Sequence, residues 1–171
     1  MFLKGSEKSK TPGETRKEEQ RAKELVLKEA DIIISTLNYS GNQILDCLRA
    51  EKNNGQPLIN TIIIDEAAQC LEVECLKPLK FKCNKLILVG DPEQLPATVL
   101  SKRAQDNGLA QSLFERVYQC FRFSDEENPI KMLYMQYRMH PSICEFPSKN
   151  FYKGRLRTSE ETAANRSQCA M

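Results

Sequence analysis

The sequence has 171 residues, 40% of them hydrophobic and 28% charged, so we expect one domain of ordinary size and folded structure over most of it. A net charge of +2 is too small to indicate nucleic-acid binding by itself, and no apolar run is long enough to cross a membrane. The seven cysteines include no Cys-x-x-Cys pair, which argues against a disulfide framework and a zinc site and favours small core thiols in a reducing compartment. We therefore expect a soluble intracellular protein without a secretion signal.

Residues 1–30 predict a polar lead-in followed by a charged helix. Thr11 and Thr15 each place a hydroxyl three residues before a glutamate, a pattern that starts helices. The helix is expected to run to about Ala30. Its acids and bases alternate around a thin apolar stripe, so a solvated face is favoured over an arm that tracks nucleic acid.

Residues 31–36 read Asp-Ile-Ile-Ile-Ser-Thr and predict a strand. The strand leads into a small polar loop at 36–41, whose hydroxyls and backbone N–H groups can approach a phosphate. An ordinary turn would explain the same loop. A helix is expected over 42–50, with three apolar residues facing inward: Ile44, Leu45 and Leu48.

Residues 60–69 read Asn-Thr-Ile-Ile-Ile-Asp-Glu-Ala-Ala-Gln, and the rest of the chain is organised around them. The continuous apolar run predicts a strand that is buried on both faces, as in a parallel sheet. Two acids, Asp65 and Glu66, follow at its carboxyl end, where open α/β sheets bind their ligands. An isolated acidic pair of this kind would be interpreted as a solvated loop.

A second strand end repeats the same pattern about twenty residues later. Residues 70–80 predict a short crossover, limited by Pro78. A strand over 85–90 then leads into the loop Gly90-Asp91-Pro92-Glu93-Gln94-Leu95-Pro96. Because the order and spacing of the two strand ends are unlikely to arise by chance, the pair indicates a metal–nucleotide site.

The remaining third of the chain predicts a change of domain. Residues 97–108 are polar and are expected to cover one side of the cleft, and 109–123 predict a core-packing helix. The acidic segment 124–129 is interpreted as a linker. A strand over 130–137 and a helix from Pro141 to Phe151, kinked or ended near Pro147, should follow. The last segment, 159–171, has no apolar periodicity and is expected to have no fixed structure.

Three of these stretches together resemble superfamily 1 helicases of the up-frameshift-like group, and within it the senataxin-like helicases: Asp65–Gln69, Gly90–Pro96 and Gln136–Pro141. Two less specific stretches fit the same group, namely Thr36-Leu37-x-x-Ser40-Gly41 and the run from Phe146-Pro147-Ser148 through Phe151-Tyr152 to Gly154. The resemblance covers about residues 30–158. It implies an α/β RecA-like P-loop NTPase fold, with 31–123 as the C-terminal part of a first domain and 130–158 as the start of a second.

The resemblance also implies that ATP and Mg²⁺ bind between the two domains. It assigns Asp65 to the magnesium ion, usually through water, and Glu66 to the attacking water as general base. Gln94 would contact the γ-phosphate and report its presence to the nucleic-acid side. Arg138 would reach across from the second domain as an arginine finger that stabilises charge in the transition state. The other residues expected to border the nucleotide are Gly90, Asp91 and Tyr137.

Some of these assignments have simpler alternatives. Arg138 could form a surface salt bridge, and for Tyr137 packing is favoured over chemistry. His140 is interpreted as local support beside Pro141 rather than as a catalytic group. Contacts with the nucleic-acid backbone are assigned to the first polar loop, through Thr36, Ser40 and Gly41.

The sequence also departs from the helicase pattern. It contains no Gly-x-x-x-x-Gly-Lys-Ser/Thr, so the lysine that holds the β- and γ-phosphates and the hydroxyl ligand of magnesium are absent. The later second-domain motifs are absent too. Ala97 stands where the family usually has a second proline, and Ala68 where glycine is common. We interpret the chain as incomplete, lacking the phosphate-loop half of the first domain and most of the second.

The expected function is therefore that of part of an ATP-dependent helicase, which is inactive by itself. The parent enzyme would hydrolyse ATP to move along single-stranded RNA or DNA and to separate strands, including RNA:DNA hybrids. The expected protein partners are transcription-termination or RNA-processing proteins. The expected location is the nucleus, with the cytoplasm as the alternative. Two alternatives stay open: a non-enzymatic binding module, and a metal-dependent nuclease using Asp65, Glu66 and Asp91.

Overall fold

The computed structural model describes residues 12–123 and 128–166. The chain divides into two compact units, Met1–Glu115 and Arg116–Met171. The expected linker at 124–129 lies mostly outside the described residues and stays a prediction, and the lead-in at 1–11 lies outside them altogether. No described helix combines the length and the apolar character that crossing a bilayer requires.

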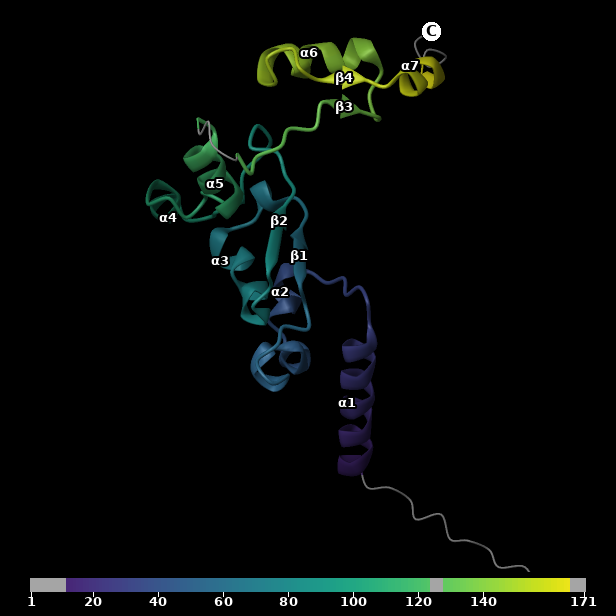
Figure 1. Cartoon of the computed structure of the whole chain (residues 1–171). Helices are drawn as coiled ribbons and strands as arrows, with labels where there is room; N and C mark the ends of the chain where they lie inside the picture. The colour runs from purple at the N-terminus through teal and green to yellow at the C-terminus, as the bar shows by residue number, and fades with distance from the viewer. Residues whose placement is uncertain (1–11, 124–127, 167–171) are drawn as a thin grey trace, which may run out of the picture. The chain divides into compact units, whose positions relative to one another are not determined.

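The first helix, α1 (Pro12–Glu29), confirms the charged helix expected there (Figure 1). Pro12 stands at its first position, where a missing N–H costs nothing, and Glu14 and Lys28 lie at the ends of the helix dipole that favour their charges. None of its residues is buried, although Leu27 packs partly against the core. This exposure agrees with the interpretation of a solvated helix.

The strand expected at 31–36 is not formed, and residues 32–36 have no regular secondary structure. Ile33 packs partly against the core, but Ile32 is 79% exposed and Ile34 is 92% exposed. A strand needs a neighbour to take up its N–H and C=O groups. Within the described residues nothing pairs with this segment, so its apolar run produces an unpaired connection instead.

Short helical turns build most of the core of the first unit. After α2 (Leu37–Ser40), the helix expected over 42–50 forms two 3₁₀ turns, η1 (Gln43–Leu48) and η2 (Ala50–Lys52). The turns are separate because Arg49 between them has an extended backbone, with φ −68° and ψ 143°. The expected inward face is confirmed, since Leu45 and Leu48 are buried and Ile44 packs against them. The buried cluster consists of Leu45, Cys47, Leu48 and Phe81.

Two parallel strands carry the first unit's sheet. The strands are β1 (Thr61–Ile64) and β2 (Lys85–Leu88), and their register pairs Thr61 with Lys85 and Ile64 with Leu88. The crossover between them consists of η3 (Ala67–Gln69), α3 (Glu72–Cys75) and η4 (Lys77–Phe81). Pro78 lies in the first turn of η4 and is buried, so the short, proline-limited crossover is confirmed.

One expectation for β1 is wrong. The strand is not buried on both faces, because Ile64 is 3% exposed while its neighbour Ile63 is 64% exposed. Adjacent side chains of a strand point to opposite faces. In the described structure a core covers only the face that carries Ile62 and Ile64.

Two helices follow the second strand, α4 (Lys102–Asp106) and α5 (Leu113–Phe121). The Ser112 hydroxyl accepts a hydrogen bond from the Glu115 N–H at 3.0 Å and so caps α5. The helix packs by its start, where Leu113 is buried, and less by its end, where Phe121 is 41% exposed. The proposed covering role of residues 97–108 stays a prediction.

The second unit begins within α5, and its other described elements are a small parallel pair of strands and two helices. These elements are β3 (Met135–Gln136), α6 (Pro141–Phe151), β4 (Arg157–Thr158) and α7 (Glu160–Arg166). The helix predicted from Pro141 to Phe151 is confirmed, and it continues through Pro147. The strand expected over 130–137 is reduced to the two residues of β3 that pair with β4.

The expectation that 159–171 has no fixed structure is wrong for 160–166, which form α7; residues 167–171 lie outside the described part of the chain. The Ser159 hydroxyl accepts from the Thr162 N–H at 3.2 Å, and Glu160 and Glu161 lie in the first turn, where a helix dipole favours acids. These cap signals are local and do not depend on an apolar stripe. Parallel pairing in both small sheets supports the α/β class, whereas a complete RecA-like sheet is not shown.

Candidate functional site

The two acidic strand ends lie beside each other because β1 and β2 are parallel and in register. The hydrogen-bonded ladder continues past both strands: Val89 N–H donates to the Ile64 carbonyl, and Ala67 N–H donates to the Val89 carbonyl, each at 2.8 Å. The segment after β1 is thereby fixed to the segment after β2. The predicted meeting of the two loops is confirmed at the level of the backbone.

Gly90 is the point of closest approach between these loops. A Cβ atom added to Gly90 would lie 2.9 Å from the Ala68 nitrogen and 3.2 Å from the Ala67 nitrogen. Both distances are shorter than ordinary contact, and both partners are backbone atoms that cannot rotate away. The glycine is therefore required by space. Its assigned place beside a nucleotide is compatible with this packing and stays a prediction.

Glu66 occupies an unusual backbone conformation. Its φ of 51° and ψ of 37° lie in the left-handed region, which non-glycine residues seldom adopt. The turn is held from both sides, because the Glu66 N–H donates to Asp65 Oδ1 at 3.0 Å and Gln69 Nε2 donates to Glu66 Oε2 at 3.2 Å. Both carboxylates remain exposed to solvent at the end of β1.

The loop after β2 is organised by Asp91. One of its carboxylate oxygens accepts from the Glu93 N–H, and the other accepts from Gln94 Nε2, each at 3.0 Å. The first contact closes an Asx-type turn across Pro92. One hydrogen of the Gln94 amide is thus held by its own loop here.

The first polar loop uses most of its side-chain groups internally. Thr36 caps α2 by accepting from the Tyr39 N–H at 3.1 Å, and the Ser40 hydroxyl donates to the Leu37 carbonyl at 2.5 Å. Ser40 is also buried, whereas Thr36 and Gly41 are exposed. Of the three residues assigned to nucleic acid, Ser40 therefore has the least accessible side chain, and the assignment stays a prediction.

In the second unit, Gln136 shapes the turn that carries Arg138. Its Oε1 accepts from the backbone N–H groups of Arg138 and Met139 at 2.9 and 2.7 Å, and its Nε2 donates to the Met139 carbonyl at 2.7 Å. The same Nε2 also donates to the Thr158 hydroxyl of β4. The Gln136 side chain thus fixes a turn from which Tyr137, 71% exposed, and Arg138 project.

Sequence reasoning gave Gln136 no role. The available signal was an amide directly before Tyr-Arg at the end of an apolar segment. His140, by contrast, has the support role expected of it, since its Nδ1 accepts from the Ser142 N–H at 3.3 Å and caps α6.

Comparison with known proteins agrees with these motifs. Residues 3–102 match a family described as AAA domain, and residues 109–170 match a second family with the same description. The probable helicase MAGATAMA 3 of Arabidopsis thaliana is 46% identical over 139 residues, covering 81% of this chain and 15% of that protein. The probable helicase senataxin of Homo sapiens is 43% identical over 152 residues, covering 86% of this chain and 6% of that protein. The chain belongs to the AAA domain family. Over most of its length it is similar to senataxin-like helicases.

A more distant relative extends the group. The regulator of nonsense transcripts 1 homolog of Neurospora crassa is 37% identical over 147 residues, covering 86% of this chain and 12% of that protein. This chain spans between 6% and 15% of the length of these three relatives. Membership of the family implies use of ATP and Mg²⁺ in general, as the sequence predicted.

Asp65 fits the expected magnesium ion. In nucleotide sites Mg²⁺ is held by one or two carboxylates together with phosphate oxygens and water. An exposed carboxylate at a strand end suits that arrangement. Among residues 12–123 and 128–166, no cluster of three or more His, Cys, Asp or Glu side chains could form a cage made of protein alone. The exposed Asp65 carboxylate thus suits an ion shared with a nucleotide.

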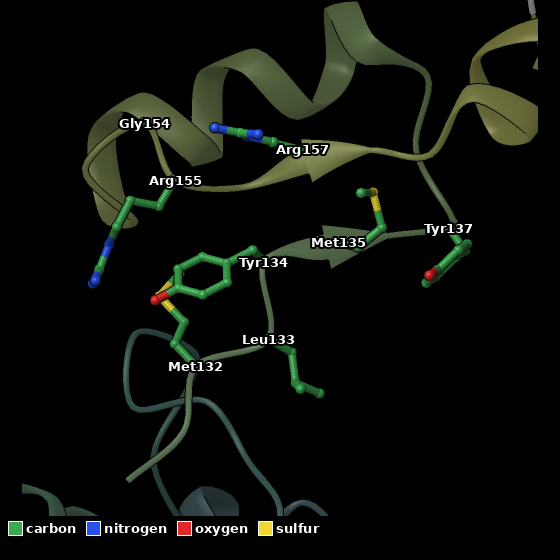
Figure 2. Close-up of a pocket in the computed structure, with 8 residues that line it drawn as sticks. All are labelled: Met132, Leu133, Tyr134, Met135, Tyr137, Gly154, Arg155 and Arg157. Carbon is green, nitrogen blue, oxygen red and sulfur yellow. The ribbon is translucent and has the colours of Figure 1, made fainter. Parts of the chain in front are cut away.

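The second unit also contains a groove of about 800 Å³ (Figure 2). Its walls are mainly apolar, and the Arg155 guanidinium lies 5.9 Å from the ring centroid of Tyr134. Tyr137 lines one end of the groove, so the groove opens next to the Gln136–Arg138 turn. The lining residues are Met132, Leu133, Tyr134, Met135, Tyr137, Gly154, Arg155 and Arg157.

The two groups of assigned residues belong to different units of the chain. Asp65, Glu66, Gly90, Asp91 and Gln94 lie together in the first unit, and Tyr137 and Arg138 lie in the second. Their convergence on one nucleotide stays a prediction.

Two thiols lie close behind the first group. Burial raises the pKa of Cys70, whose Sγ donates to the Glu66 carbonyl at 3.4 Å, and it raises the pKa of the fully buried Cys75 to about 11. Both are therefore poor nucleophiles, and Cys70 also supports the loop through its bond to Glu66.

Proposed function

We propose that this chain forms part of an ATP-dependent helicase that hydrolyses ATP to move along single-stranded nucleic acid and to separate strands, RNA:DNA hybrids among them. The observation that carries the proposal is the backbone connection between the two acidic strand ends, through the Ala67–Val89 hydrogen bond and the approach of Gly90. This connection holds a carboxylate pair and an amide at one edge of a parallel sheet, where α/β folds bind nucleotides.

Each assigned residue has a role that its surroundings support. Asp65 would hold the magnesium ion, which when bound withdraws charge from the phosphate oxygens. Glu66 would accept a proton from the attacking water, and the Gln69 amide on Oε2 fixes the orientation of its carboxylate. The Gln94 amide would exchange its Asp91 partner for the γ-phosphate and so change the loop when ATP is present.

Arg138 would act from the second unit. The Gln136 side chain fixes the backbone N–H of Arg138 but not its guanidinium, which is exposed. A positioned backbone with a free planar cation suits a group that must reach a phosphate during closure. Tyr137 beside it would border the nucleotide. The assignment predicts that Arg138 contributes to hydrolysis only when both units are present around ATP.

The test is a chimera. The stretch of an intact senataxin-like helicase that corresponds to residues 30–158 is replaced by these residues, and ATP turnover is measured with and without single-stranded RNA. We expect turnover in the chimera, and loss of about 100-fold or more on Glu66→Gln, because a general base is worth that much. Glu93→Gln is the matched control, since it removes one charge from the neighbouring loop at a residue without an assigned role.

Two results would count against the proposal. A chimera whose turnover survives Glu66→Gln would remove the general base from the mechanism. Comparable turnover by residues 1–171 alone would contradict the expectation that a chain without the Gly-Lys-Ser/Thr loop hydrolyses almost no ATP.

The second candidate is a non-enzymatic binding module, and the missing phosphate-binding sequence is the observation that favours it. Such a module would compete for nucleic acid or for protein partners of the intact helicase, for example in transcription termination or RNA processing in the nucleus. An inactive chimera, combined with binding of single-stranded RNA by residues 1–171, would support this candidate over the enzymatic one.

A further inference from the structure

Lys77, at the start of η4, lies against the polar loop Thr36–Gly41 of the first unit. Its Nζ donates a hydrogen bond to Asn38 Oδ1. A Cβ atom on Gly41 would lie 3.9 Å from Lys77 Cδ, so the aliphatic stem passes over the glycine. This contact joins segments 39 residues apart in the sequence and brings a cation to the loop from another element.

The charge of Lys77 is less compensated than the charges of its neighbours. Lys80 pairs with Asp46 at 2.9 Å, and Lys82 pairs with Glu51. Lys77 takes part in neither pair, and its hydrogen-bond partner is a neutral amide. The Glu74 carboxylate, one turn earlier, accepts from the Leu71 N–H at 3.2 Å.

The loop itself supplies only neutral side-chain donors. The Ser40 hydroxyl is buried and donates to the Leu37 carbonyl, whereas Thr36, whose oxygen accepts from the Tyr39 N–H, still has an O–H that can donate. A charged donor for a phosphate above this loop has to come from another element. Lys77 is a partly exposed cation that already contacts the loop, so it can supply that donor.

On the basis of the proposed function, we propose that Lys77 binds a backbone phosphate of single-stranded nucleic acid lying over the Thr36–Gly41 loop. An ammonium ion at a phosphate attracts every sequence alike, and it releases counterions when it binds. Asn38 keeps the ammonium beside the loop when no strand is bound. The contact adds affinity without base readout, as movement along a strand requires.

The experiment measures binding of a fluorescein-labelled oligouridylate to residues 1–171 by fluorescence anisotropy over a series of salt concentrations. Loss of one phosphate contact to a single strand should reduce the slope of log K against log salt by about 0.7. The same relation gives a loss of about fivefold in affinity near 0.1 M salt. We expect this from Lys77→Gln, whereas Lys77→Arg should retain the slope.

Two variants separate phosphate binding from a structural brace. Lys85→Gln removes an exposed lysine charge at the start of β2 and should leave affinity and slope unchanged. Asn38→Ala removes the amide but keeps the cation, so it should also retain the slope. If circular dichroism shows that the Lys77→Gln variant is folded, and its slope of log K against log salt equals that of the unmodified chain, the inference is overturned.

A second measurement needs no substitution at Lys77. The unmodified chain is acetylated with and without the oligouridylate, and modification of each lysine is followed by mass spectrometry. Bound strand should protect Lys77 and not Lys85, and equal modification of Lys77 in both samples would overturn the inference. Absence of any oligouridylate binding at the lowest salt would also overturn it, whereas the ATP turnover of the chimera reports separately on the proposed function.

Discussion

Replacing Gly90 by alanine tests whether the two acidic strand ends depend on close backbone packing. The added methyl would lie 2.9 Å from the Ala68 nitrogen and 3.2 Å from the Ala67 nitrogen. Carbon atoms prefer contacts of about 3.5–4.0 Å, so the loops must separate by roughly half an ångström. Ala67 cannot move freely, because its N–H is bonded to the Val89 carbonyl at 2.8 Å.

Overpacking of this kind costs about 1–3 kcal/mol. The φ of Gly90 is not positive, so the cost arises from contact rather than from an unfavourable backbone angle. At a denaturant dependence of about 2 kcal/mol per molar urea, a loss of about 2 kcal/mol lowers the unfolding midpoint by about 1 M. Far-UV circular dichroism of residues 1–171 in urea measures this shift.

Gly13→Ala is the matched control. Gly13 lies in α1 with no atom within 4 Å of an added Cβ, so the substitution should leave stability unchanged or raise it by up to about 1 kcal/mol. If Gly90→Ala unfolds at the same urea concentration as the unmodified chain, the close approach does not constrain the loops and the reasoning is wrong. In the helicase chimera, the same substitution should reduce ATP turnover, because Glu66 directly precedes the displaced residues.

Two further predictions concern titratable groups of the first unit. The hydrogen bond from Lys80 lowers the pKa of the Asp46 carboxyl group. The ionised carboxylate therefore stabilises the folded state at neutral pH, and this contribution is lost as the pH falls through the lowered pKa of Asp46. Lys80→Gln should therefore reduce stability at neutral pH and make less difference in acid, which urea unfolding at several pH values would show; a difference that grows in acid would contradict it. Cys75 is 0% exposed, and burial raises the pKa of its thiol to about 11. Iodoacetamide should therefore modify Cys75 far more slowly than the exposed Cys120. Peptide mass spectrometry would measure both rates, and similar rates would mean that the core around Cys75 opens readily.

The elements that sequence predicted well carry their signals locally. Consecutive isoleucines at 62–64 define β1, and the turn residues Gly90 and Pro92 mark the end of the second strand. His140 and Pro141 together specify the start of α6, because one caps it and the other suits its first turn. The parallel arrangement of the two strands was predicted from the continuous apolar run of β1, and the segment between the strands is long enough for the crossover that it requires.

The errors concern structure that depends on distant partners or on a signal other than apolar periodicity. Strand formation at 31–36 and burial of Ile63 both require a neighbouring layer that the segment itself does not specify. For α7, the cap at Ser159 and the acids that follow it were available signals, but the prediction rested on the absence of an apolar stripe alone.

The candidate functional site shows the same division between local signals and features that depend on distant partners. Spacing placed Asp65, Glu66 and Gln94 correctly at neighbouring strand ends, because motif order follows strand order. It did not reveal the partners of their side chains. The bond from Gln69 to Glu66 and the fourfold engagement of Gln136 depend on rotamers and on backbone angles. Burial of the Ser40 hydroxyl likewise follows from the tertiary packing of α2.

The left-handed backbone of Glu66 limits how this protein could be stabilised by design. Replacement of a residue at positive φ by glycine commonly relieves roughly 1 kcal/mol of steric cost. A procedure that optimises folding alone would therefore choose glycine at position 66 and delete the carboxylate proposed as the base. Thermostable variants of this segment should instead be sought at Asn54, Lys82 and Lys153, which share the conformation and have no assigned part in the reaction.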